Sequence, residues 1–411
     1  MHKKLKFPSV NPVWLRVMAI TIGLFFVFFS DAILSYWVPG FIQDTLGNAF
    51  FMGLVLSFSS IIGLLADLLF PQLLKGTSVK KLMFYAILSS AVFGGLLLLS
   101  IWYPWILIML LAMAAWGIYY EFLGFANQQF VAETVPLQQR SGAWAIIELF
   151  QSLAYFLGPL IAVMLLEFTN WIVILTAMIM TIIAYVIFIT LKLKDSNVTT
   201  KIEDINLITE FKHWIVLVKH VWPIVLISLI HGFIDATFWT TGAVLSEKLA
   251  EQNPLGGFFL PAFTLPTLFL GFILVKVKIY TNKKKISELF LIIAGVFLIL
   301  LGLNSNVEWQ LITALVIGIM QALSGPLSDA VYSDIIARMG RERKHLIGLS
   351  SSTSSISYIF APVIMGLIAS FVGESFTFTY LGIGVLVLSI VLLIFTPRKL
   401  KLPQKEIKTW S

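Results

Sequence analysis

The stretch Ile20–Trp37 reads ITIGLFFVFFSDAILSYW and contains a single charged residue, Asp31. An α-helix needs about 20 predominantly apolar residues to cross a bilayer. Two later stretches, Trp105–Tyr120 and Ile172–Leu191, are similarly apolar. A transmembrane β-barrel would instead show stretches of about ten residues with alternating polarity, and none occur in this sequence. The sequence therefore predicts an all-α membrane protein.

The composition of the chain agrees with this prediction. Of its 411 residues, 59% are hydrophobic and 12% are charged, whereas a globular protein carries about 25% charged residues. The basic start is followed by an apolar run of full span length without a small-residue cleavage pattern, so no cleavable signal peptide is expected. Cysteine is absent, which excludes disulfides and thiolate metal sites.

Twelve apolar blocks are predicted to be membrane spans, six in each half of the chain. In the first half they are Trp14–Val38, Phe51–Leu74, Leu82–Ile101, Pro104–Phe130, Ala143–Leu166 and Trp171–Lys192. In the second half they are His220–Ser246, Gly257–Val277, Ile286–Leu303, Trp309–Ile336, Leu346–Phe371 and Phe376–Phe395. The predicted domains are a six-helix bundle at 1–192, a connecting segment at 193–219, a second bundle at 220–397 and a basic tail at 398–411.

Lysine and arginine gather in every second loop between these spans, as in the turns that hold Lys80, Lys284 and Arg343. Cytoplasmic loops of membrane proteins accumulate these residues. Both termini are therefore expected in the cytoplasm, and the membrane is expected to be the plasma membrane. The net charge of +7 is then a consequence of topology. Nucleic-acid binding is not expected, because the basic residues are scattered over separate loops.

The two halves of the sequence repeat each other. A shift of 204 residues places Asp31-Ala32 on Asp235-Ala236 and Lys80-Lys81 on Lys284-Lys285. A shift of one residue less superposes further uncommon residues, namely Arg140 on Arg343, Tyr155 on Tyr358 and Pro159 on Pro362. Two six-span halves in parallel are the repeat pattern of the major facilitator superfamily.

Short motifs also resemble that superfamily. Gly63-Leu64-Leu65-Ala66-Asp67 is similar to the start of its loop-two signature, although Leu68–Pro71 replaces the basic residues that usually follow. Gly158-Pro159 and the Asp-x7-Pro arrangement from Asp31 resemble drug/proton antiporters, but the span-four arginine of such exporters is absent. The segment Glu133 to Arg140 resembles the acidic-to-arginine loop of the family, and Asp334 to Arg341 repeats its spacing.

This resemblance implies two six-helix bundles that rock about a central site, working as a monomer on a small-molecule substrate. It implies gating roles for seven residues. Independently of the resemblance, proline within a span indicates a helix kink or a close helix contact. The gating candidates are Gly63, Asp67, Glu133, Arg140, Asp334, Arg341 and Arg343, and the kink candidates are Pro159 and Pro362.

Carboxylates at membrane depth are costly and are therefore candidates for function. Asp31 and its repeat mate Asp235 are expected to face each other across the central cavity and to bind protons. His231 lies one helical turn before Asp235, so the two are predicted to form a proton-handling couple. Each aspartate could instead bond only to neighbouring helices without titrating, and His231 could be a packing residue.

Glu121 lies in the run Trp116-Gly117-Ile118-Tyr119-Tyr120-Glu121. Aromatic side chains beside one acid can hold a cation or stack against a ring, so Glu121 and Tyr120 are candidate substrate residues. An aromatic packing stripe with one paired acid is the alternative reading of the same run.

The sequence lacks a phosphate-binding glycine loop and a zinc-protease pair, so no cofactor, metal or nucleotide engine is expected. We therefore predict a secondary transporter that moves a small organic solute by alternating access. It is expected to be proton-coupled, and a drug or metabolite exporter is one form. A membrane-embedded enzyme, and a receptor or lipid scramblase on the same fold, remain alternatives.

Overall fold

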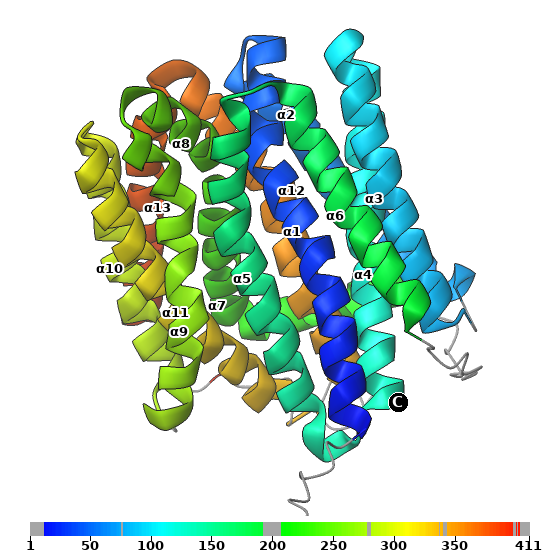
Figure 1. Cartoon of the computed structure of the whole chain (residues 1–411). Helices are drawn as coiled ribbons and strands as arrows, with labels where there is room; N and C mark the ends of the chain where they lie inside the picture. The colour runs from blue at the N-terminus through cyan, green and yellow to red at the C-terminus, as the bar shows by residue number, and fades with distance from the viewer. Residues whose placement is uncertain are drawn as a thin grey trace, which may run out of the picture.

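The computed structural model describes residues 12–74, 77–191, 207–277, 281–336, 338–339, 343–397, 400 and 402. In this part of the chain all regular structure is helical, and long helices stand side by side (Figure 1). Eleven membrane-length apolar helices occur among the described residues, and a shorter apolar stretch at Pro254–Leu270 corresponds to the eighth predicted span, Gly257–Val277. The predicted all-α membrane fold is confirmed.

The first half contains α1 (Pro12–Leu46), α2 (Ala49–Leu73), α3 (Val79–Trp102), α4 (Ile106–Thr134), η1 (Leu137–Gln139), α5 (Arg140–Leu166) and α6 (Asn170–Thr190). The second half contains α7 (Leu207–Trp239), α8 (Thr241–Gln252), η2 (Pro254–Phe258), α9 (Phe259–Val277), α10 (Lys283–Leu303), α11 (Val307–Ile336), α12 (Arg343–Val372) and α13 (Glu374–Phe395).

Two helices differ from the predicted spans. α1 continues through Pro39 to Leu46 and ends before Gly47, whose φ of +67° suits glycine. The seventh span is built from two helices, because Thr240 has a non-helical backbone (φ −116°, ψ −85°) between α7 and α8. α7 also starts at Leu207, so it includes residues that were assigned to the connecting segment.

The two halves use the same packing pattern. α1 packs on α5 and α3 packs on α4 and α6; correspondingly α7 packs on α12 and α10 packs on α11 and α13. Between the halves, α2 packs on α12 and α5 on α9. The predicted pair of pseudo-symmetric six-helix bundles is therefore confirmed. The domain boundaries stay predictions, since residues 192–206 and most of the tail lie outside the described residues.

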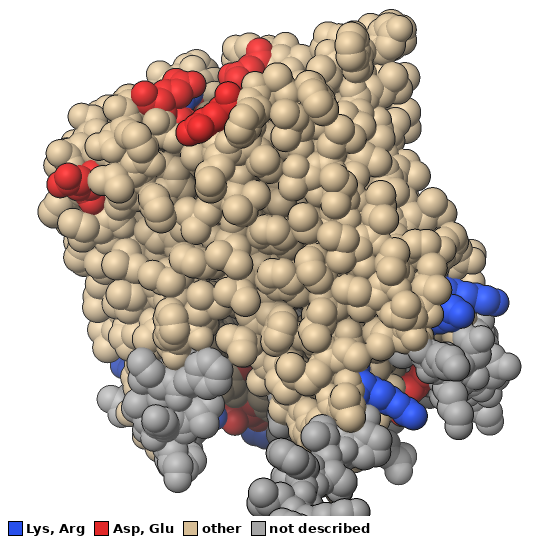
Figure 2. Space-filling view, in the orientation of Figure 1, with Lys and Arg blue, Asp and Glu red and all other residues tan. Residues whose placement is uncertain are grey.

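Charged residues separate toward the two ends of the helices. In Figure 2 most of the visible Asp and Glu lie at the upper end, and most of the visible Lys and Arg lie toward the lower end. We name the upper end, with Asp44, Glu251 and Glu374, the acidic end. The lower end, with Lys80 and Lys283, is the basic end.

The two bundles meet closely at the acidic end. Tyr36 of α1 donates a hydrogen bond to Ser246 of α8 over 3.1 Å, and Gln43 of α1 donates to Glu374 of α13 over 2.6 Å. Gly53 of α2 lies so close to the carbonyl oxygen of Pro362 that a Cβ would come within 2.0 Å of it. We name this contact zone between α1 or α2 and α8, α12 or α13 the acidic-end seam. It closes the space between the bundles on this side.

Candidate solute and proton site

Asp31 of α1 is held by three donors from two other helices. Trp116 Nε1 of α4 donates to Oδ1 over 2.7 Å, and the Tyr120 hydroxyl of α4 donates to Oδ2 over 2.8 Å. The Tyr155 hydroxyl of α5 also donates to Oδ2. Only 4% of Asp31 is exposed. Buried carboxylates need such partners, and here aromatic side chains supply all three.

Asp235 of α7 repeats part of this arrangement in the other bundle. The Tyr358 hydroxyl of α12 donates to Asp235 Oδ2 over 2.6 Å. Tyr155 and Tyr358 are repeat mates, as are the two aspartates. The contact between α1 and α5 in one bundle therefore corresponds to the contact between α7 and α12 in the other. Each bundle therefore contains an Asp–Tyr hydrogen bond at an equivalent position.

The two Asp–Tyr pairs lie near each other between the bundles. The ring of Tyr155 meets the ring of Trp239, four residues after Asp235, edge to face with centroids 5.2 Å apart. The charge of Asp31 also acts on Tyr358 in the opposite bundle. Tyr120 is 39% exposed although it lies midway along α4. These contacts place the candidate site in the middle of the protein, at the interface of the two halves.

His231 does not form the predicted couple with Asp235. Its ring nitrogens contact Gln321 and, over 3.0 Å, Ser324, both on α11. Gln321 Nε2 in turn donates to the backbone oxygen of His231 over 3.2 Å. One helical turn brings two residues to one side of a helix, but here the imidazole turns toward α11 whereas Asp235 turns toward α12. His231 therefore joins α7 to α11.

Glu121 is separated from the aromatic residues that surround its position in the sequence. Trp116 and Tyr120 point to Asp31, whereas Glu121 points to α2, where it hydrogen-bonds Asp67. A Cβ on Gly63 would lie 3.1 Å from Glu121 Oε1. Successive helical residues point about 100° apart, so the acid cannot share the face of Tyr120. Glu121 and Tyr120 therefore do not line one wall together, and a solute role for Glu121 stays a prediction.

The gating candidates near the basic end take part in local contacts. Arg140 donates to the backbone oxygens of Val135 and Ala132, over 3.2 and 2.6 Å, and so caps the end of α4. Glu133 accepts a hydrogen bond from Gln129 over 2.7 Å. Asp334 forms an ion pair with Lys283 at 2.7 Å. Arg341 lies outside the described residues, and so does the side chain of Arg343. Their gating roles remain predictions.

Both candidate kink residues lie inside continuous helices, Pro159 in α5 and Pro362 in α12. Beside Pro159, Gly158 packs on Ala32, where a Cβ would come within 2.4 Å of the alanine Cβ. This close approach brings α5 to α1 next to Asp31. Tight interhelical contact is the feature observed at these positions, and kinking stays a prediction.

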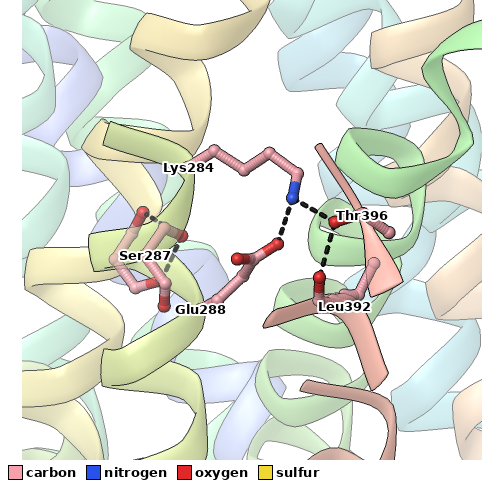
Figure 3. A network of polar contacts seen from close by, with 6 residues as sticks. Lys284, Ser287, Glu288, Leu392 and Thr396 are labelled. Atoms are coloured by element: carbon pink, nitrogen blue, oxygen red, sulfur yellow. Dashed lines mark hydrogen bonds and ion pairs between the residues drawn. The ribbon is translucent and has the colours of Figure 1, made fainter. Parts of the chain in front are cut away.

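The second bundle also contains a buried polar network between α10, α11 and the end of α13 (Figure 3). Lys284 Nζ lies 2.5 Å from Glu288 Oε1, with the side chains 2% and 0% exposed, and it also donates to Thr396. Ser287 contacts Ser324 over 2.6 Å. Because Ser324 also contacts His231, polar contacts extend from α7 through α11 into α10.

Several residues of the site were missed in the sequence. Tyr155 and Tyr358 were visible as repeat mates, but the repeat alone did not connect them to the aspartates. The only sequence signal for Trp116 was its place in the aromatic run. Gln321 and Ser324 gave no signal, because isolated polar residues are common in membrane helices.

This geometry defines a chemical class of site. Two carboxyl groups, each with phenolic donors, face an interface between two similar bundles, and such groups can exchange protons or hold a polar solute. Among the described residues there is no group of three or more His, Cys, Asp or Glu that could hold a metal ion. The fold and site together are those of a two-bundle membrane transporter.

Comparisons with known proteins identify the family. The profile of the Major Facilitator Superfamily matches residues 20–341 and, in a second match, residues 224–410. The chain therefore belongs to this superfamily and is a membrane transporter, not an enzyme. It is 24% identical over 297 residues to the staphylopine export protein of Staphylococcus aureus (strain Mu50 / ATCC 700699), which covers 69% of this chain and 72% of that protein.

Solved transporter structures show the same fold at low sequence identity. A peptide transporter of the POT type in complex with sulfate aligns with a TM-score of 0.72 and 13% identity, covering 93% of this chain and 94% of the other. The human organic anion transporter MFSD10 (TETRAN) aligns with a TM-score of 0.66 and 13% identity, covering 93% and 100%.

Proposed function

We propose that this transporter is proton-coupled and exports a small organic solute through the plasma membrane. The observation that supports the proposal is the pair of repeat-related contacts Asp31–Tyr155 and Asp235–Tyr358 at the interface of the two bundles. A charged residue at the bilayer centre costs about 2.5–3.5 kcal/mol on insertion scales. Two such residues at equivalent positions are therefore expected to serve the transport cycle.

The coupling follows from what each aspartate contacts. Asp31 binds donors from α4 and α5, and Asp235 binds a donor from α12, so each aspartate is bonded within its own bundle. Rocking of the bundles would instead open the interface where Tyr155 meets Trp239 and so change the access of water and solute to both carboxyl groups. A carboxyl group that gains water releases its proton more readily, so proton release and solute binding would alternate at the same place.

Sequence and similarity support the proposed direction of transport and class of solute. Lysine and arginine accumulate in cytoplasmic loops, which supports an orientation with the basic end and both termini inside and the acidic end outside. The relative named above is an export protein for staphylopine, so staphylopine is the first solute to test. The central acids favour a cationic or neutral solute over an anion. The unit that transports is expected to be the monomer.

Transport into everted membrane vesicles tests this proposal. With an inside-acid proton gradient, vesicles that contain the protein should accumulate staphylopine, and a protonophore should abolish the accumulation. Vesicles with the double variant Asp31→Asn/Asp235→Asn are the matched control. Accumulation that persists unchanged with protonophore would show that protons do not drive transport.

Alternating exposure provides a second test, for which the cysteine-free sequence is suited. Single cysteines at the central site should become accessible from one side of the membrane and then the other when solute is added. Accessibility that stays on one side under all conditions would contradict a transport cycle.

A further inference from the structure

Glu247 of α8 lies in the acidic-end seam and contacts the backbone of α1 directly. A Cβ on Gly40 of α1 would lie only 1.9 Å from Glu247 Oε2 and 2.7 Å from its carboxyl carbon. The residue before Glu247 is Ser246, which accepts a hydrogen bond from Tyr36 of α1 over 3.1 Å. Glycine at position 40 therefore makes room for a carboxyl group between the two bundles. The carboxyl group fits there only while the seam is closed.

In the described part of the chain this carboxyl group forms no ion pair. Glu247 Oε1 is buried and has no hydrogen-bond partner among the described residues. The nearby charges that act on it are those of Asp44 of α1 and Glu251 of α8, which are both negative. The carboxyl groups of Glu247, Asp44 and Glu251 thus lie close together.

The neighbouring cation is already engaged. Lys248 Nζ lies 2.6 Å from Glu374 Oε1 of α13, and Gln43 donates to the same oxygen over 2.6 Å. Glu374 therefore has two partners, whereas Glu247 Oε1 has none among the described residues. The titratable groups that face Glu247 are then Tyr36 and Asp44 on α1 and Glu251 on its own helix, with Lys248 held by Glu374 on α13.

Burying an ionised carboxylate without a partner is unfavourable, and two like charges nearby add to the cost. A bound proton removes both penalties while the seam is closed. Opening the seam would bring water to the group and make the ionised form acceptable. We propose that Glu247 is a second proton-binding site, separate from the central aspartates, and that the proton bound there holds the acidic-end seam closed.

This inference rests on the proposed function, because it assumes a cycle in which the acidic end opens and closes. The proton binds more tightly to Glu247 when the seam is closed than when it is open. A more acidic solution at the acidic end therefore shifts the equilibrium toward the closed seam. The proton at Glu247 enters and leaves on the acidic side and is not carried across. External acidity would thus promote the return of the emptied transporter to the state with a closed acidic end.

Cysteine labelling tests the inference. Ser35 lies in α1 between Asp31 and Gly40, is 5% exposed and hydrogen-bonds Tyr120, so Ser35→Cys reports on the central side of the seam. It is labelled with a membrane-impermeant maleimide, and its rate is divided by that of Glu308→Cys, an exposed position at the acidic end. This control corrects for thiol ionisation. It also fixes the membrane face: intact cells are used if it labels from outside, and everted vesicles otherwise.

The normalised rate at Ser35→Cys should rise about tenfold from mildly acidic to mildly alkaline solution, which corresponds to about 1.4 kcal/mol between closed and open forms. Adding Glu247→Gln, a neutral analogue of the protonated acid, should keep the rate low at both pH values. A rate that does not depend on pH, or the same pH dependence with Glu247→Gln, would overturn the inference.

Gly40→Ala provides a test that does not depend on Glu247→Gln folding. The added methyl group occupies the place of the carboxyl group, so Glu247 is displaced from the seam and labelling should lose its pH dependence. A pH dependence equal to that of the parent would contradict the inference. Measuring staphylopine transport as well separates the two proposals. If transport is proton-driven but labelling does not depend on pH, only the role of Glu247 is wrong. If labelling depends on Glu247 but transport is not proton-driven, only the proposed function is wrong.

Discussion

The two bundles repeat one another in helix packing but hold their central aspartates differently. Asp31 is 4% exposed and has three donors, whereas Asp235 has two, Tyr358 and Trp239, and no second tyrosine in the place of Tyr120. Asp235 is half-buried and accepts from Tyr358. The repeat has therefore kept the Asp–Tyr pair while its surroundings diverged. Asp235 is the acid that a solute or water reaches more easily.

A second difference concerns a pair of lysines that the repeat places at equivalent positions. Lys80 in the first bundle is exposed, whereas its mate Lys284 is buried against Glu288. The position that matches Glu288 is Phe84, so no acid lies one helical turn after Lys80. Equivalent lysines of the repeat thus differ in role: Lys80 lies exposed at the protein surface, whereas Lys284 forms a buried ion pair.

The largest expected effect comes from breaking this internal tie. Lys284→Met should reduce the free energy of unfolding by about 3–5 kcal/mol, because it removes the ion-pair partner of the buried Glu288. Lys80→Met should change it by no more than about 0.5 kcal/mol. Denaturant or thermal unfolding of the purified protein in detergent measures both. The double variant Lys284→Met/Glu288→Leu should recover most of the loss, and equal effects of the two single lysine variants would contradict the comparison.

Removing one tyrosine hydroxyl from each bundle sharpens the comparison of the aspartates. A hydrogen bond to a charged group contributes about 1.5–3 kcal/mol, so Tyr358→Phe should reduce the transport rate by about tenfold or more. Tyr155→Phe should cost about threefold, because Asp31 keeps two other donors. Initial rates of solute uptake into vesicles give both values. A larger loss of transport rate for Tyr155→Phe than for Tyr358→Phe would show that Asp31, not Asp235, depends more on its tyrosine.

A smaller effect is expected at His231. His231→Gln should change transport by less than about threefold, because an amide can replace part of the bonding to Gln321 and Ser324. The pH profile of the transport rate should stay in place. A shift of that profile would restore the direct couple with Asp235 that the structure does not form.

The smallest effect is expected at Glu121. Its repeat position is Gly325, so it has no acidic mate, and its contact is with Asp67. Glu121→Gln retains a donor and an acceptor and should leave transport within about twofold of the parent. Loss of transport in this variant, measured at saturating solute, would show that Glu121 has a role in solute transport after all.

The sequence predicted the fold because apolar blocks and basic loops act over whole helices. It also placed Asp31 and Asp235 together, since rare residues recurred at one offset. It could not assign Glu121 or His231, because the direction of a side chain depends on which neighbouring helix offers a partner. The acidic-end seam was missed for a similar reason: nothing in the sequence near Gly40 indicates that Glu247 packs on it from 207 residues away.

The central claim is that the repeat-related aspartates couple proton and solute movement. Asparagine imitates a protonated aspartate that cannot release its proton, so Asp31→Asn and Asp235→Asn test it most directly. In proteoliposomes each variant should lose proton-gradient-driven accumulation of solute while retaining exchange of labelled for unlabelled solute, which needs no proton release. Proton-driven accumulation at the parent rate in the double variant would contradict the account.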